Sequence, residues 1–454
     1  MVFLVGGANS ASDFEIENSL RFNDSDSAYL SITPSSAGNR RTFTYSGWIK
    51  TDVATASSKA LLSCGSDSGS NDYIMFQSGD KLRFSFGTEG NGDIITTRLF
   101  RDPAAWYHIV WAVDTTQGTA ANRVKLYVNG TQASDVTGTY PDQNYDTSFN
   151  NTEVQRIGAR AYSATQYYEG YMSDVYLIDG AQKAASDFGE TNDNGVWVPK
   201  KYTGTYGTNG FKLEFQQTGT SANASGMGAD TSGNGNHLTP SNLTSIDVTT
   251  DTPTNNFATL NPLSNKLQAS YSEGNLDEAC NDNYGVGATQ AFANGKWYWE
   301  VKIKAGDNNL VGIANADEQD RFTTVFGINN YSLTVYGVNG MIIREGSNVE
   351  DVDDTYGAND IVGVAVDMDS GTRTVQFYKN GSAFGSAATL PTNWGLTLPM
   401  IRKGGSSQTS SFNFGNPAFS ISSGNADENG YGNFEYSVPS GFYALCTKNL
   451  AEFG

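Results

Sequence analysis

Short stretches of alternating apolar and polar residues recur along the first half of the chain, separated by residues that favour tight turns. Alternation with a period of two is typical of β-strands with one buried face, whereas an amphipathic helix repeats every 3.6 residues. Gly79-Asp80 and Asn129-Gly130 favour hairpin turns. No amphipathic helix longer than two turns is predicted. The predicted strands of this half are residues 19–23, 42–50, 73–76, 81–86, 106–113, 124–128 and 170–179.

The pattern weakens after this half and then returns. Residues 217–256 are dense in Ser, Thr, Asn and Gly, and residues 210–215 give the clearest strand signal around them. We interpret residues 181–290 as an irregular connector with short strands. The predicted strands of the second half are residues 295–303, 310–314, 332–336, 360–367, 374–378, 411–414 and 442–445.

One motif occurs in both halves of the chain. Residues 109–114 are a buried-strand pattern that ends in Asp, and residues 124–130 are a return strand that contains Tyr and ends in Asn-Gly. Residues 362–367 and 375–381 repeat these features in the same order. Two unrelated hairpins can look alike, but the shared order of the features favours a common sandwich plan.

The predicted fold class is therefore all-β, with two antiparallel β-sandwich domains of the jelly-roll type joined by the irregular segment. A chain of 454 residues is long enough for two or three domains. We place the sandwiches at residues 19–180 and 291–454, with the connector at 181–290. Residues 1–18 are predicted to be an N-terminal arm or docking segment.

The charge balance narrows the classes of partner. The formal net charge is −20, from 48 acidic and 28 basic residues. A chain this acidic is repelled by phosphate backbones, so no nucleic-acid partner is expected. No apolar run approaches 18 residues and the first residues lack a basic segment, so neither membrane insertion nor a signal peptide is expected. We expect synthesis and folding in a reducing cytosol.

Cysteine and histidine are too scarce for most metal or disulfide frameworks. Cys64, Cys280 and Cys446 are far apart, and His108 and His237 are the two histidines. Neither a disulfide framework nor a structural zinc site is therefore expected.

Each half contains a set of motifs that carries a family resemblance. In the first half these are residues 43–49, 106–111 and 125–130. With these motifs, residues from about 19 to 180 resemble the laminin-G-like, concanavalin-A-type jelly-roll domain. In the second half the motifs are residues 295–301, 311–314, 360–367 and 375–381. With these, residues from about 290 to 447 resemble a SPRY domain.

Five further segments carry a third resemblance, at residues 3–10, 18–22, 187–190, 197–202 and 252–257. They resemble virion structural proteins of marine tailed bacteriophages. This resemblance implies a tail fibre, spike or capsid decoration protein on the virion surface, made in the host cytoplasm, with other virion proteins and a host-surface glycan or receptor as partners. Fibres and spikes are often trimers, so a homo-oligomer is expected, although no heptad stretch specifies a trimer here.

No catalytic residue is predicted. Concanavalin-A-type folds also carry glycoside hydrolases, which need two carboxylates about 5–9 Å apart, but the strand motif Glu-x-Asp-x-x-Glu does not occur. A hydrolase triad needs a histidine beside its nucleophile. His108 lies within a buried strand pattern and is predicted to be a packing residue. His237 ends the polar loop 230–237, which is either a plain turn or a calcium loop.

No cofactor is expected, with calcium as the one alternative. Acidic clusters offer the oxygen ligands that calcium prefers. The sequence interpretation leaves a solvated loop and a calcium site open for the cluster formed by Glu350, Asp351, Asp353 and Asp354.

Candidate binding residues come from aromatic loops and from the SPRY resemblance. Sugar-binding sandwiches stack sugars on exposed aromatic rings, and ordinary packing is the alternative for each ring. Tyr140 and Tyr145 are further candidates in the loop 138–150. The main candidates are Tyr162, Tyr167 and Tyr168 in the first half and Asp320, Arg321, Tyr336 and Trp394 in the second.

Three functions remain open from the sequence. The first is a non-enzymatic binding protein of the virion surface, used in host attachment. The second is a carbohydrate-active enzyme, a glycoside hydrolase or lyase, on the N-terminal sandwich. The third is a purely architectural capsid or tail subunit.

Overall fold

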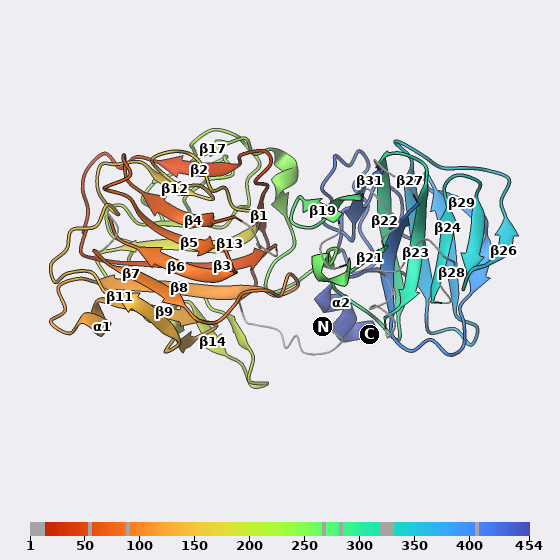
Figure 1. Ribbon diagram of the computed structural model, residues 1–454, viewed down its shortest axis with the longest axis horizontal. Coiled ribbons are helices and arrows are strands. Elements are labelled where there is room, and N and C mark those ends of the chain that lie inside the picture. The colour runs from red at the N-terminus through yellow and green to blue at the C-terminus, as the bar shows by residue number, and fades with distance from the viewer. Residues whose placement is uncertain are drawn as a thin grey trace. The chain divides into compact units, whose positions relative to one another are not determined.

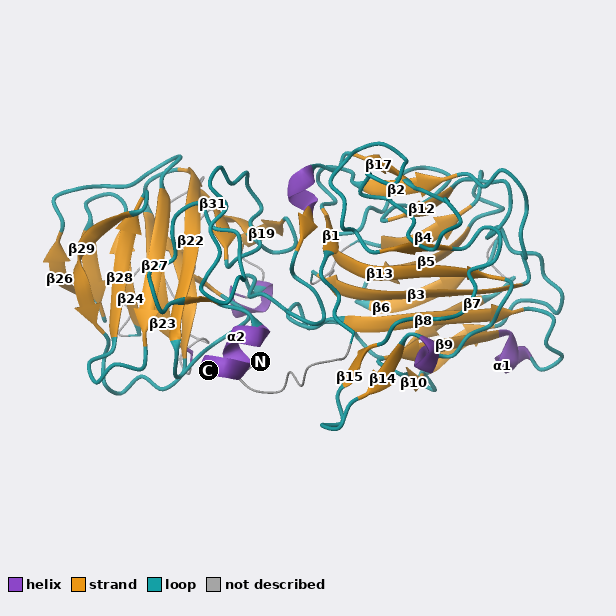
Figure 2. Ribbon diagram, turned by 180° about the vertical axis from the view of Figure 1, so that it is seen from behind, coloured by secondary structure: helices purple, strands orange, loops and turns teal. Residues whose placement is uncertain are grey.

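Two compact units make up the chain, one formed by Ser10–Thr254 and the other containing Asn255–Gly454. The computed structural model describes residues 14–52, 57–87, 91–265, 269–280, 285–316, 331–404 and 408–454. Strands dominate both units (Figures 1 and 2). The described helices are short, and none is long and apolar enough to cross a membrane. They are α1 (Ala120–Arg123), α2 (Thr447–Phe453) and the 3-10 helices η1 (Ala185–Asp187), η2 (Ser245–Asp247) and η3 (Pro262–Asn265).

The first unit is a sandwich of two antiparallel sheets. One sheet contains β1 (Ser19–Phe22), β3 (Thr42–Thr51), β8 (Tyr107–Asp114), β9 (Val124–Val128), β10 (Thr131–Gln132), β13 (Gly170–Asp179), β16 (Phe211–Leu213) and β18 (Val248–Thr249). Its order is β10-β9-β8-β3-β13-β1-β18, and β16 also pairs with β13. The other contains β2 (Tyr29–Ile32), β4 (Lys59–Cys64), β5 (Asp72–Gln77), β6 (Lys81–Ser85), β7 (Asp93–Thr96), β11 (Val136–Thr139), β12 (Gln155–Ile157) and β17 (Thr239–Ser241). Its order is β11-β7-β6-β5-β4-β12-β2-β17.

Side-chain alternation builds the core between these sheets. Along β9, Val124, Leu126 and Val128 are buried while the residues between them are partly exposed. From the facing sheet, Phe84 packs on Trp111 with ring centroids 4.5 Å apart. Each such side chain contributes about 1.5–3 kcal/mol when it is removed from water. The alternation of apolar and polar residues in the sequence therefore matches the alternation of buried and partly exposed side chains along the strand.

A second aromatic layer covers the outer face of the first sheet. Residues 181–206, which include β14 (Gly189–Thr191) and β15 (Trp197–Pro199), supply Phe188 and Tyr202 to a cluster with Tyr176 of β13. The Phe188 and Tyr202 rings stack with centroids 5.0 Å apart. All ten residues of β13 are consequently buried, because both faces of this strand are covered.

The segment that the sequence treats as a connector is divided between the units. Residues 181–254 cluster with the first unit and residues 255–290 with the second. The first part supplies β14–β18, so it forms the outer aromatic layer and further strands of the first sandwich.

The second unit is also a sandwich. One sheet contains β19 (Ala269–Ser272), β20 (Asp277–Cys280), β22 (Lys296–Ala305), β27 (Ile361–Asp367), β28 (Thr374–Lys379), β29 (Ser382–Thr389), β31 (Gln408–Asn413) and β32 (Tyr443–Ala444). Its order is β19-β20-β31-β22-β27-β28-β29, and β32 pairs parallel with β22. The other contains β21 (Gly285–Gly287), β23 (Asn309–Asn315), β24 (Ser332–Tyr336), β25 (Met341–Arg344), β26 (Ser347–Asp351) and β30 (Thr397–Lys403), in the order β21-β30-β23-β24-β25-β26.

The motif found twice in the sequence forms the same hairpin in both units. β8 pairs with β9, and β27 pairs with β28, each antiparallel. After the return strands, Asn129 and Asn380 have φ of 46° and 49°, and Gly130 and Gly381 have φ of 79° and 80°. Two consecutive positive φ angles are the signature of the type I′ turn. The predicted all-β fold with two antiparallel sandwiches is confirmed.

Candidate functional site

The outer face of the second sheet of the first unit carries tyrosine and arginine side chains. Strand alternation places them there, because neighbours such as Ile74, Leu82 and Ile157 enter the core. A loop between β12 and β13 adds further members. The set, called the tyrosine–arginine face below, consists of Tyr29, Tyr73, Arg83, Arg156, Arg160, Tyr162 and Tyr167.

Arg160 is the centre of this face. Its guanidinium carbon lies 4.2 Å from the ring centroid of Tyr73 and 5.3 Å from that of Tyr162. Gln166 Oε1 accepts a hydrogen bond from Nη1 at 3.0 Å. With its amide oxygen turned toward Arg160, Asn71 accepts from Nη2 at 3.0 Å and from Nε at 3.2 Å. Arg160 is therefore held in one position, and Tyr162, which is 39% exposed, forms the outer end of the stack.

Arg156 continues the face toward β2. Its guanidinium carbon lies 4.9 Å from the ring centroid of Tyr29, and its Nη1 donates to the Arg160 carbonyl at 3.0 Å. The rings of Tyr29 and Tyr167 stack with their centroids 6.4 Å apart. Within the described part of the chain, neither Arg156 nor Arg160 has a carboxylate within salt-bridge distance.

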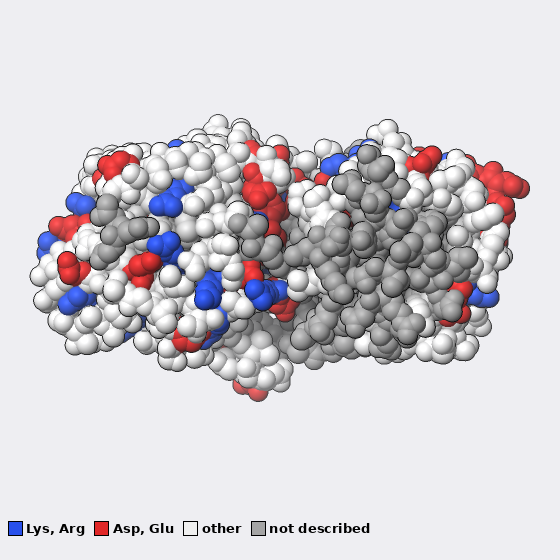
Figure 3. All heavy atoms as spheres, viewed as in Figure 1, with Lys and Arg blue, Asp and Glu red and all other residues white. Residues whose placement is uncertain are grey.

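Several arginines of this unit, including Arg83 of the same face, form ion pairs with carboxylates. Arg83 binds both carboxylate oxygens of Asp93 at 2.7 and 2.8 Å, and Arg98 binds those of Asp135 at 2.7 Å each. Basic and acidic groups are also interspersed on the face of this unit shown in Figure 3. Arg40 and Arg123 also lack a carboxylate within salt-bridge distance among the described residues, but their guanidinium groups donate to backbone carbonyls. Arg156 and Arg160 differ from them because they lie against the tyrosine rings of this face.

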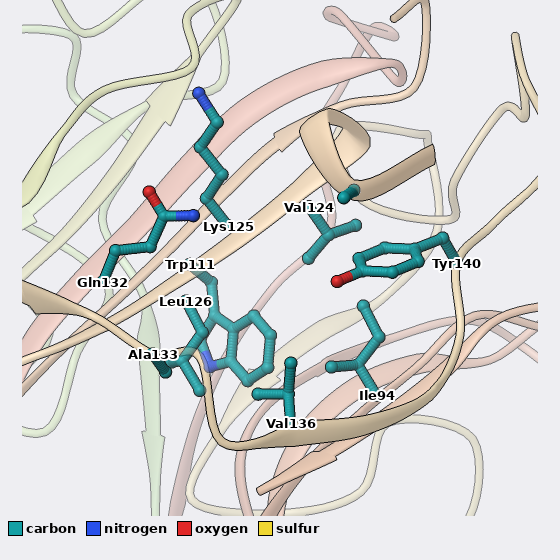
Figure 4. Close-up of a pocket in the computed structure, with 10 residues that line it drawn as sticks. Ile94, Trp111, Val124, Lys125, Leu126, Gln132, Ala133, Val136 and Tyr140 are labelled. Carbon is teal, nitrogen blue, oxygen red and sulfur yellow. The ribbon is translucent and has the colours of Figure 1, made fainter. Parts of the chain in front are cut away.

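A small pocket lies at one end of the same sandwich (Figure 4). Its volume is about 70 Å³. Its walls come from both sheets, with Ile94 of β7 and Val136 of β11 opposite residues of β8 and β9, and α1 contributes Ala121. The full lining is Ile94, Trp111, Ala121, Val124, Lys125, Leu126, Gln132, Ala133, Val136 and Tyr140.

Two of the predicted binding tyrosines belong to the tyrosine–arginine face. Tyr162 is exposed, and Tyr167 is half-buried, with its hydroxyl donating to the Ala164 carbonyl. Tyr168 differs, because its side chain is fully buried in the core and its hydroxyl donates to the Lys50 carbonyl at 3.1 Å. Tyr168 is a packing residue, with no ring face left for a ligand.

The two described binding candidates of the second unit both form hydrogen bonds within the domain. Trp394 is buried in the core, and its Nε1 donates to Glu345 Oε1 at 3.2 Å. Tyr336 is half-buried in β24 and donates to Asn308 Oδ1 at 2.7 Å. Asp320 and Arg321 lie outside the described residues.

The acidic candidates for calcium have protein partners. Glu350 accepts from the Ser386 backbone N–H with Oε1 at 3.1 Å and Oε2 at 3.0 Å, so it bridges β26 and β29. Both Asp354 oxygens lie 3.1 Å from Lys379 Nζ. Asp351 accepts from the Asp353 N–H at 3.3 Å. In the described ranges no group of three or more His, Cys, Asp or Glu could hold a metal ion. Calcium binding stays a prediction.

His108 is a packing residue, as the sequence predicts. Its ring stacks between Trp48 and Trp197, with centroids 4.8 and 6.0 Å away. Nε2 contacts Ser46 Oγ at 2.9 Å, and Nδ1 accepts from Trp197 Nε1 at 3.1 Å. Burial lowers the pKa of His108 to about 3, so the imidazole is neutral at physiological pH.

His237 belongs to a loop that satisfies its own polar groups. Its Nδ1 accepts from the Asp230 N–H at 3.0 Å. The Asp230 carboxylate accepts from Ser232 and Asn236 backbone N–H groups at 2.8 and 2.9 Å. This bonding pattern is typical of an Asx-type turn.

Several buried carboxyl groups have raised pKa values but are committed to structural bonds. Burial raises the pKa of Asp72 to about 7, and its oxygens accept from the Gly87 and Ser148 backbone N–H groups. Burial also raises the pKa of Asp174 to about 6, where the Tyr176 hydroxyl donates to it at 2.7 Å. These carboxylates hold loops and strands in place.

Sequence reasoning missed most of the tyrosine–arginine face. It did not single out Tyr29, Tyr73, Arg156 or Arg160, because these tyrosines are distant in sequence from the arginines that they contact. The available signal is the close spacing of Arg156, Arg160 and Tyr162, which lie in the short strand β12 and directly after it.

Comparisons with known proteins agree with the two sandwiches. The Concanavalin A-like lectin/glucanases superfamily, laminin G type, matches residues 24–186. The SPRY domain family matches residues 296–417. A search of curated proteins finds no match.

Solved structures similar to the chain include three SPRY domains. The SPRY domain of human HERC1 is 13% identical, with 30% of this chain and 87% of that chain covered and a TM-score of 0.25. The TRIM65 PSpry domain is 17% identical, with 34% and 91% covered and a TM-score of 0.29. A human SPRY domain is 14% identical, with 32% and 94% covered and a TM-score of 0.25. The chain thus contains a Concanavalin A-like, laminin-G-type domain followed by a SPRY domain.

Proposed function

We propose that this chain is a non-enzymatic binding protein of a virion surface, and that it contacts a host glycan through the tyrosine–arginine face. The observation that carries the glycan proposal is the exposed ring of Tyr162 at the end of a fixed stack on Arg160 and Tyr73. An aromatic ring offers a large, rigid contact surface at a low entropic cost.

Arg156 and Arg160 add hydrogen-bond donors beside this ring. A guanidinium has five N–H donors in a planar fork. Arg160 uses Nε, Nη1 and Nη2 to hold its own position. Arg156 donates from Nη1 to the Arg160 carbonyl and its Nε is buried, so Nη2 is the group left to donate to a sugar hydroxyl or carboxylate oxygen. The face therefore combines a stacking surface with preorganised donors.

The bonding of the buried carboxyls supports a role without catalysis. A glycoside hydrolase needs two carboxyl groups that flank a sugar bond. Asp72 and Asp174, whose pKa values are raised, are engaged by backbone and tyrosine donors inside the first unit. Reproducible cleavage of a polysaccharide, abolished by substitution of one carboxylate, would overturn this part of the proposal.

The virion location rests on the segments that resemble tailed-phage structural proteins. As a fibre, spike or decoration protein, the chain would also contact neighbouring virion proteins and form a homo-oligomer, with a trimer as the usual form of a fibre. A density map of the assembled particle tests this location. An exposed or distal position is expected, whereas an inner position between capsid subunits would favour an architectural role.

Substitution of Tyr162 tests the glycan site directly. We expect Tyr162→Ala to weaken binding to a printed glycan array and to host cells by about fivefold to thirtyfold, since aromatic contacts of this kind contribute on the order of 1–2 kcal/mol. Leu99→Ala is the matched control, because Leu99 is 43% exposed in the same unit and lies outside the face. Equal binding by both variants and the parent chain would contradict the proposed site.

A further inference from the structure

The pocket at the end of the first sandwich has apolar walls and a limited size. Ile94, Val124, Leu126 and Val136 surround it. Its volume of about 70 Å³ is roughly half of the ~150 Å³ cavity that accommodates benzene in a protein core. The pocket therefore has room for a group of a few heavy atoms, and a whole sugar ring does not fit inside it.

One buried donor in the lining has no acceptor. Trp111 is fully buried, and its Nε1–H has no hydrogen-bond partner among the described residues. Buried indole N–H groups usually have a partner, because an unpaired buried donor is unfavourable. In Figure 4 the indole lies beside Leu126, Ala133 and Val136. A ligand oxygen in the pocket would satisfy this group.

Polar groups at the rim are also uncommitted. The described contacts give the Tyr140 hydroxyl, the Gln132 amide and Lys125 Nζ no hydrogen bond or ion pair. Figure 4 shows the hydroxyl end of Tyr140 directed toward Trp111, between Val124 and Ile94. An apolar cavity with a few convergent polar groups is the usual form of a small-ligand site.

We propose that this pocket binds the acetamido group of an N-acetylated sugar. The methyl group packs against the apolar walls, the carbonyl oxygen accepts from Trp111 Nε1–H, and the amide N–H donates to the Tyr140 hydroxyl. The sugar ring stays outside, beside Gln132 and Lys125. This inference rests on the proposed glycan-binding function, but it concerns a different site from the tyrosine–arginine face.

The chemistry of the pocket favours an acetamido group over other small groups. A sugar hydroxyl lacks the apolar end that these walls require. An alkyl group has no acceptor for the indole N–H. A carboxylate would have to lose its hydration in an apolar cavity, which is unfavourable for a charged group.

The indole N–H resonance of Trp111 provides a direct readout. In the full ¹⁵N-labelled chain, this resonance is assigned by its loss in Trp111→Phe. We expect methyl N-acetyl-β-glucosaminide to shift it in a saturable manner at millimolar concentrations, and methyl β-glucoside to leave it unchanged. Equal shifts with both glycosides, or no shift with either, would overturn the proposal.

Filling the pocket supplies the matched test. Ala133→Leu places a larger side chain in the lining, and we expect it to abolish the shift. Ser134→Leu is the control, because Ser134 is the next residue, exposed and outside the lining. Should Ala133→Leu fail to fold, Tyr140→Phe removes only the hydroxyl and is expected to weaken binding about fivefold. A shift retained in full by either pocket variant would contradict the site.

Failure of the pocket and failure of the proposed function are distinguishable. Tyr162→Ala leaves the pocket lining intact, so the Trp111 shift should persist in that variant. If the chain binds no glycan on an array but still shows the N-acetyl-specific shift, the result supports the pocket and contradicts the proposed glycan-binding function.

Discussion

The hairpins β8–β9 and β27–β28 allow the two units to be compared residue by residue. In each, the asparagine of the turn bonds the first strand of the hairpin, with Asn129 Oδ1 accepting from the His108 N–H at 2.8 Å and Asn380 Oδ1 from the Ile361 N–H at 2.9 Å. In each, an aromatic ring covers the glycine that follows. A Cβ at Gly130 would lie 2.3 Å from Trp197 Cε3.

The second hairpin has the same arrangement with a different ring. A Cβ at Gly381 would lie 2.5 Å from Tyr436 Cδ1. The rings are anchored by different chemistry. Trp197 donates from its own indole to neutral His108, whereas the Tyr436 backbone N–H donates to Glu300 Oε1 at 2.8 Å. The same local turn is therefore completed by an imidazole in one unit and by a buried carboxylate in the other.

The largest expected effect comes from removing the carboxylate anchor. Glu300 accepts from the backbone N–H groups of Glu435 and Tyr436 and from Asn413 Nδ2, and burial raises its pKa. Glu300→Ala leaves the buried Asn413 amide and the partly buried Glu435 and Tyr436 N–H groups without this acceptor. We expect the free energy of unfolding of the second unit to fall by about 4 kcal/mol in urea denaturation.

An exposed carboxylate serves as the control for this variant. Glu452 is exposed near the C-terminal end of α2 and accepts one bond, from Asn429 at 3.0 Å. Glu452→Ala should cost less than about 0.5 kcal/mol. A loss below about 1 kcal/mol in Glu300→Ala would mean that the carboxylate does not anchor the covering segment.

The second-largest effect is expected from substituting the two glycines that the aromatic rings cover. Gly130→Ala and Gly381→Ala each combine a positive φ with a clash against the covering ring, so we expect each to cost about 3 kcal/mol. Gly79 also has a positive φ, but a Cβ there meets no atom within 4 Å. Gly79→Ala should therefore cost only about 1 kcal/mol. If thermal or urea unfolding shows the same loss of unfolding free energy for all three variants, the covering rings move aside without an energetic cost.

A smaller, pH-dependent effect should separate the two anchors. Burial lowers the pKa of His108 from 6.5 to about 3. Between these values the unfolded chain binds a proton that the folded chain excludes, so this contribution to stability is complete above pH 6.5 and is lost as the pH falls. Both histidines of the sequence precede residue 255, so the second unit has no equivalent group.

Comparison with His108→Gln isolates this contribution. From pH 6.5 to pH 5 we expect the parent chain to lose about 2 kcal/mol more of its unfolding free energy than the variant does. The difference between the two chains cancels other titrating groups, including Asp72, whose pKa of about 7 acts with the opposite sign. If the unfolding free energies of the two chains change in parallel with pH, the His108 imidazole is protonated as readily in the folded chain as in the unfolded chain.

The strands and hairpins could be predicted because their signals are local. The predicted strand 170–179 coincides with β13, and Gly79-Asp80 joins β5 to β6 as expected. The aromatic layer over the first sheet could not be predicted in the same way. Phe188 and Tyr202 are isolated aromatic residues among turn-forming residues, and their burial comes from contact with a distant strand.

The site was only partly predictable for a related reason. Tyr162, Tyr167 and Tyr168 are close in sequence, yet one ring is exposed and another is in the core. The backbone between them turns through positive φ angles at Ala164 and Gln166, of 46° and 54°. These angles redirect the rings, and neither residue type signals them, because such angles are uncommon for both.

The bridge from Glu350 to the Ser386 amide has a consequence for crowded assemblies. β26 and β29 end their sheets in the described structure, and an unpaired strand edge invites pairing with the edge of another chain. The carboxylate occupies an amide that an incoming strand would need and adds negative charge beside it. This carboxylate therefore disfavours edge-to-edge strand pairing between neighbouring copies of the chain.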